Sequence, residues 1–84
     1  MEKEEIFAEL QNILNQLSID LKFGRGYFEG GLYKYKDQSV IYLNRTHTIE
    51  KHINILCQEI KNYDLEGIEL NPAIRIYLEN PEDN

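Results

Sequence analysis

Two histidines and an acidic residue, the side chains that metal sites use, lie close together in the sequence as His47, Glu50 and His52. Zn²⁺ accepts such ligands, and on a helix they lie three or four residues apart so that they share one face. The two histidines are five residues apart and diverge in direction, and a complete structural zinc site needs four ligands. We therefore expect no metal and no other cofactor.

Cys57 is the single cysteine and the obvious nucleophile. It falls in the apolar arc of a predicted helix over residues 49–63, where a thiol is typically buried, neutral and unreactive. His52 does not share its face, and Ser18 and Ser39 lack the glycines of a nucleophile elbow. One cysteine also excludes an internal disulfide, which fits a reducing compartment. Because no catalytic motif is complete, we predict that the chain is not an enzyme.

Residues 24–31 contain four glycines and could be taken for a phosphate-binding loop. A dinucleotide fingerprint would need a glycine at Glu29 and a helix directly afterwards, whereas a strand pattern follows. We interpret the segment as a mobile or bulged connection.

Hydrophobic periodicity supplies the elements that would position these residues. A period of 3.6 predicts helices over residues 2–18 and 49–63, and Asn71-Pro72 starts a third. Alternation predicts strands over residues 19–23, 32–36 and 40–44. We expect one α+β domain over residues 1–79 with order α-β-β-β-α-α: two layers, with a three-stranded, mainly antiparallel sheet and helices on one face. Residues 80–84 read as a disordered tail.

The second and third strands predict a hairpin that turns through Asp37-Gln38. One of its faces would carry aliphatic side chains, and the other would carry Tyr33, Tyr35 and Tyr42. If the helices cover the aliphatic face, the tyrosines stay partly uncovered and form a candidate interaction surface. Ile55 lies outside the apolar arc of its helix and suggests a second contact, with the last helix or with a second subunit.

Charge and hydropathy restrict the partners. The net charge is −6, but residues 22–45 carry five basic and two acidic side chains, a net charge of +3. Basic and aromatic residues together suit single-stranded nucleic acid, yet the acidic remainder repels phosphate, so nucleic acid is disfavoured. No apolar run reaches the roughly 20 residues of a membrane span, and the start Met-Glu-Lys-Glu-Glu is unlike a signal peptide. We expect a cytoplasmic protein without a membrane partner.

Two segments, Gly30-Gly31-Leu32 and Pro72-Ala73-Ile74-Arg75, bracket the hairpin and the helix that follows it. This order of signals covers about two thirds of the chain and resembles a family of small uncharacterised bacterial proteins, which has no established activity to transfer.

The strand at residues 40–44 and the helix after it are also similar, more distantly, to the core of minimal zinc metallopeptidases, whose helix bears H-E-x-x-H. In the best register this motif falls on residues 58–62, where Gln58 and Asn62 replace both histidines and only Glu59 matches. The resemblance implies a degenerate domain without zinc or peptidase activity.

Together these observations predict a non-enzymatic protein-interaction module, with a homodimer as one form of it. The candidate interaction surface consists of Tyr33, Tyr35, Tyr42 and Ile55. A degenerate hydrolase-like domain centred on Glu59 and His52 is one alternative, and single-stranded nucleic-acid binding through the basic aromatic sheet face is the other.

Overall fold

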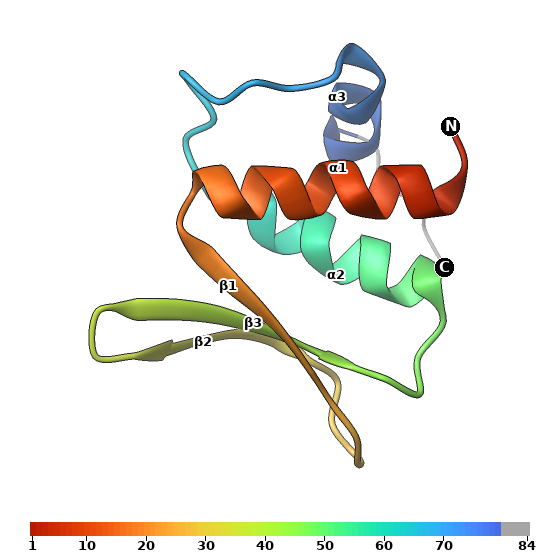
Figure 1. Ribbon diagram of the computed structural model, residues 1–84, viewed down its shortest axis with the longest axis vertical. Coiled ribbons are helices and arrows are strands. Elements are labelled where there is room, and N and C mark those ends of the chain that lie inside the picture. Colours follow the sequence, from red (N-terminus) through yellow and green to blue (C-terminus); the bar gives the residue numbers. More distant parts are fainter. Residues whose placement is uncertain (80–84) are drawn as a thin grey trace.

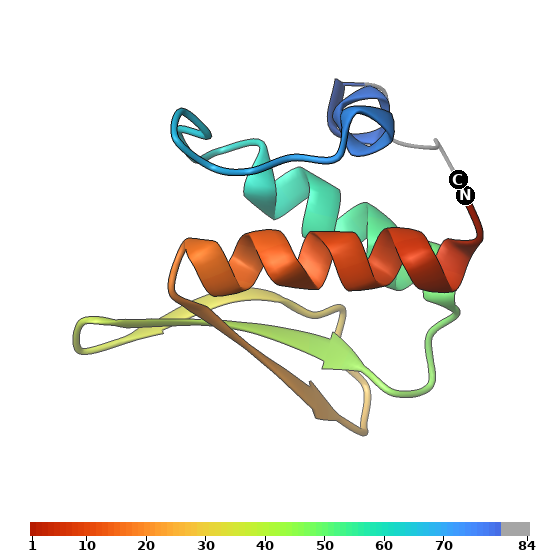
Figure 2. The ribbon, with the colours of Figure 1, turned by 45° about the horizontal axis from the view of Figure 1, so that its top comes forward.

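The computed structural model describes residues 1–79, which form three helices and three strands in the predicted order. The helices are α1 (Lys3–Gln16), α2 (Ile49–Ile60) and α3 (Pro72–Glu79); the strands are β1 (Ile19–Gly24), β2 (Gly31–Tyr35) and β3 (Gln38–Asn44). Helices α1 and α2 cover one face of the sheet, and α3 packs on these two helices away from the sheet (Figures 1 and 2). The predicted α+β class is confirmed. The predicted tail, residues 80–84, lies outside the described residues.

The sheet is mixed, with strand order β1-β3-β2. Strand β2 pairs with β3 antiparallel, as predicted, but β1 pairs with β3 parallel. The expectation of a mainly antiparallel sheet is therefore wrong for one of the two strand pairs. The central place falls to β3, which carries the uninterrupted apolar run at residues 40–43, because the centre of a sheet is its most buried position. Residues 25–30 consequently cross the end of β3 to reach its other side (Figure 1).

The hairpin turns one residue earlier than predicted. Tyr35 pairs with Gln38, so the loop is Lys36-Asp37, and Lys36 takes a left-handed conformation with φ +57°. Tyr33 consequently lies opposite Val40 instead of Tyr42. A turn through Asp37-Gln38 would have paired Tyr35 with Val40, two residues beyond its actual partner Gln38. Because side chains alternate between the faces with a period of two, this shift leaves every side chain on its predicted face. The aliphatic side of the hairpin meets the helices, as expected.

One apolar core joins the sheet, α1 and α2, and α3 adds two buried side chains to it. Its helical members recur every three or four residues, which confirms the predicted faces of the helices. The buried apolar residues are Ile6, Leu10, Ile13, Leu14, Ile19, Ile41, Leu43, Ile53, Leu56, Cys57, Ile60, Ile74 and Leu78.

Polar side chains cap the starts of α2 and α3. The Thr48 hydroxyl accepts a hydrogen bond from the Lys51 amide at 3.2 Å, and the Asn71 side-chain oxygen accepts one from the Ala73 amide at 2.9 Å. Each bond satisfies an amide that has no partner within its own helix. Within residues 1–79, no helix combines the length and the apolar content that crossing a bilayer requires.

Candidate functional site

The sheet face opposite the helices carries an aromatic surface, here called the tyrosine face: Tyr33, Tyr35, Val40 and Tyr42. Tyr33 is 52% exposed and Tyr35 is 72% exposed. The rings of Tyr33 and Tyr42 meet edge to face with their centroids 5.6 Å apart, since the two residues are diagonal neighbours across the hairpin. The Lys36 ammonium lies 5.5 Å from the centroid of the Tyr35 ring. The three tyrosines named from the sequence thus form one surface.

Polar side chains of β1 complete this face of the sheet. Lys22 is in register with Tyr42, and Asp20 is in register with Val40, so both side chains point away from the helices. The Asp20 carboxylate accepts a hydrogen bond from the Gln38 amide at 2.9 Å. The border of the tyrosine face thus carries charges of both signs, the Lys22 and Lys36 ammonium groups and the Asp20 carboxylate.

Ile55, the fourth residue of the predicted surface, lies apart from the tyrosines, on α2 and on the helix side of the sheet. It is half-buried and packs against the core. Its Cδ1 lies 3.4 Å from the place that a Cβ on Gly30 would occupy, and Tyr42 O lies 2.7 Å from that place. Gly30 also has φ +95°, so this position requires glycine both for its conformation and for the close approach of β3.

Ile55 forms the floor of a groove between α2 and the start of β2, here called the α2–β2 groove, with a volume of about 260 Å³. Of the three positions in the degenerate motif, Gln58 and Glu59 line this groove, and Asn62 lies just beyond the end of α2. Lys51 and Glu29 form an ion pair at 3.3 Å across one end of the groove.

The two histidines, His47 and His52, lie in different surroundings. The Nε2 atom of His52 lies 2.8 Å from the Asn44 carbonyl oxygen, and its ring packs edge-on against Phe23 at 5.7 Å between centroids. Across residues 1–79, no three histidine, cysteine, aspartate or glutamate side chains are placed to share a metal ion. His52 instead ties α2 to the end of β3.

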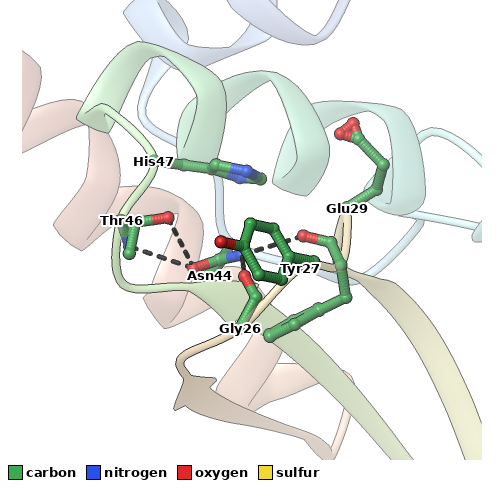
Figure 3. A pocket seen from close by; sticks show the side chains of 7 residues that line it. Gly26, Tyr27, Glu29, Asn44, Thr46 and His47 are labelled. Atoms are coloured by element: carbon green, nitrogen blue, oxygen red, sulfur yellow. Dashed lines mark hydrogen bonds between the residues drawn. The ribbon is translucent and has the colours of Figure 1, made fainter.

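A second hollow, of about 740 Å³, lies where residues 25–30 cross the end of β3 (Figure 3). Asn44, which is 1% exposed, holds its wall: the side-chain amide donates to the carbonyls of Gly26 and Phe28 at 2.7 and 2.9 Å. The side-chain oxygen accepts from the Thr46 amide and hydroxyl at 3.0 and 2.8 Å. The glycine-rich segment, which was expected to be a mobile or bulged connection, is thus held by one buried side chain.

Sequence reasoning missed this role of Asn44. The signal was an asparagine at the end of an apolar strand with a threonine two residues later, which is typical of a side chain bonded to the following turn. His47 also lines the hollow, and its Nδ1 atom is buried without a hydrogen-bond partner among residues 1–79. Because that nitrogen is shielded from solvent, it offers a ligand in the hollow no direct contact.

The rate at which the Cys57 thiol is alkylated tests the prediction that this cysteine is buried and unreactive. Burial raises the pKa of Cys57 from its ordinary value of 9.0 to about 11, and the nearby Lys61 ammonium opposes this only in part. At pH 8 we expect iodoacetamide to alkylate the native protein about a hundredfold more slowly than the protein in guanidinium, because each pKa unit lowers the thiolate population tenfold. Equal rates in the two states would contradict the burial.

The same pKa shift has a consequence for stability. The folded state holds the thiol proton more tightly than the unfolded state, so the contribution of Cys57 is complete below about pH 9 and is lost as the pH rises toward about 11. Urea titrations at pH 9 and pH 11 should therefore show a smaller fall in the free energy of unfolding for Cys57→Ala than for the wild type.

Comparison with known protein families, with curated proteins and with solved structures found no match to this chain. The resemblances to the uncharacterised bacterial family and to the metallopeptidase core therefore stay predictions.

Proposed function

We propose that this protein is a non-enzymatic protein-binding module and that it contacts its partner through the tyrosine face. The observation that carries the proposal is the exposure of Tyr33 and Tyr35, at 52% and 72%, on a sheet face that lies opposite the helices. Tyrosine rings are enriched at protein interfaces because they bury a large apolar area while the hydroxyl keeps a polar contact.

The size of the face supports a limited contact. Strands about 4.8 Å apart that rise about 3.3 Å per residue give three short strands a face of about 300 Å². A standard stable interface buries about 800 Å² on each partner. A short segment or a small part of the partner therefore fits the face alone, whereas the predicted homodimer needs additional surface from neighbouring loops.

Site-specific photo-cross-linking in cells that express the protein tests this function. With benzoylphenylalanine in place of Tyr33 or Tyr35, we expect the same cross-linked species from both positions and none from Gln11, which is exposed on α1. A species of twice the chain mass would identify the homodimer, and light scattering across a dilution series of the pure protein would check it. Identical bands from all three positions, or no band from Tyr33 and Tyr35, would refute the tyrosine face as the contact surface.

A further inference from the structure

The β2 strand lies at an edge of the sheet and has a strand neighbour on one side only, β3. Among residues 1–79, no strand pairs with its outer side. An edge of this kind presents backbone N–H and C=O groups that can pair with a further strand.

The α2–β2 groove runs along this start of β2. Gly30 and Gly31 supply one wall and α2 supplies the other. Its volume of about 260 Å³ is below the roughly 300 to 1,000 Å³ typical of small-molecule sites. The groove is therefore suited to a few side chains of a strand laid beside β2.

The side chains of α2 give the groove a definite chemistry. Ile55 offers an apolar floor, and Asn54 and Gln58, four residues apart on one face of the helix, offer amide groups. Neither amide hydrogen-bonds to another residue in the described part of the chain. These groups are therefore available to the polar atoms of an extended peptide.

The charge of Glu59 indicates which kind of side chain a peptide in the α2–β2 groove would carry. Lys51 is already paired with Glu29, whereas the half-buried Glu59 carboxylate has no ion-pair partner within residues 1–79. A cation in the groove would meet the carboxylate in a partly desolvated place, where attraction is stronger than in open water. The groove thus favours lysine or arginine.

The distance between Ile55 and Glu59 on α2 is close to the distance between side chains on one face of a strand. Ile55 and Glu59 are one helical turn apart, which places their Cβ atoms about 5 to 6 Å from each other. Side chains on one face of a strand recur every two residues, or about 6.6 Å. A strand with an aliphatic residue and a basic residue two positions apart matches both partners.

We propose that an extended segment of a partner protein adds to the β2 edge as a fourth strand, with an aliphatic side chain against Ile55 and a basic side chain beside Glu59. This inference rests on the proposed function, because the segment is part of the partner. The intervening side chains of the added strand point to the other face, next to Tyr33.

Selection from a nine-residue random peptide library displayed on phage, against the immobilised full chain, tests the proposal. We expect enriched peptides with an aliphatic residue and a lysine or arginine two positions apart. Glu59→Lys should weaken the selected peptide at least tenfold and shift a repeated selection to aspartate or glutamate. Glu66→Lys, an exposed charge change outside the groove, should leave both unchanged. If Glu59→Lys fails to fold, Glu59→Gln should still abolish the preference for a basic residue.

Backbone pairing has its own readout. N-methylation of the selected peptide should weaken binding at least tenfold at alternate positions only, and binding should slow amide exchange in β2. Four results would each contradict the proposal of an added strand. They are an enriched motif that does not change with Glu59→Lys, equal effects of methylation at every position, pairing of β2 with a second copy of the chain, and no enrichment. If Tyr33 and Tyr35 cross-link to a partner but the peptide selection fails, the proposed function is retained and only the added strand is rejected. If the cross-linking and the selection both fail, the proposed function and the added strand are both rejected.

Discussion

Replacing Leu56 with alanine is expected to lower the free energy of unfolding by about 2 to 5 kcal/mol, since the truncation removes buried methyl groups and leaves a cavity. Leu56 is fully buried at the centre of α2, among core residues contributed by the sheet and all three helices. A domain of this size has a free energy of unfolding of about 4 to 13 kcal/mol, so the variant should lose a large part of it. A urea titration followed by circular dichroism measures the change.

Gln58→Ala is the matched control because it changes an exposed side chain on the same helix two residues later. Its stability should stay within about 0.5 kcal/mol of the wild type. Equal urea midpoints for Leu56→Ala and Gln58→Ala would mean that α2 does not present Leu56 to the core.

The second large effect is expected from Asn44→Ala, at about 2 to 4 kcal/mol. The substitution removes all four hydrogen bonds of the Asn44 side chain and leaves the carbonyls of Gly26 and Phe28 and the amide of Thr46 without their partner. Each buried polar group left unsatisfied costs about 1 to 3 kcal/mol, and the total is less than the sum because the loop relaxes toward water.

Limited trypsin digestion localises this effect. Arg25 lies in the crossing segment that Asn44 holds, so its cleavage should speed up more than cleavage after Lys36 in the hairpin turn. Asn44→Asp separates the two halves of the network, because it keeps the acceptor for Thr46 and loses the donor for Gly26 and Phe28. Equal acceleration at Arg25 and Lys36 would indicate global destabilisation and would contradict a local role.

The helices and the faces of the strands could be predicted because their signals are local. The apolar stripe of α1 that contains Ile13 and Leu14 and the apolar arc of α2 that contains Leu56 repeat with the helical period, and these three side chains are buried. The caps at Thr48 and Asn71 depend on neighbours two or three residues away. Alternation in the hairpin assigned the tyrosines to one face even though the turn was misplaced by one residue, since a shift of two in register preserves the faces.

The candidate sites were harder to predict because they join distant segments. The groove combines Gly30 and Gly31 with Ile55 and Glu59, which only the packing of α2 beside β2 brings together. The bonds of Asn44 to Gly26 and Phe28 exist because residues 25–30 cross the end of β3. Sequence spacing signals the local bonds of Asn44 to Thr46, but it contains no signal for its bonds to Gly26 and Phe28 or for the groove.

The sequence by itself thus determined which segments become helices and strands and which side chains face the core, because period, capping and alternation depend on residues close in the chain. The tertiary structure alone decided that β3 lies between β1 and β2, that one strand pair is parallel and that an open edge runs beside α2. Strand order depends on which assembly of the whole chain buries the most apolar surface, and the run at residues 40–43 gains most from the centre.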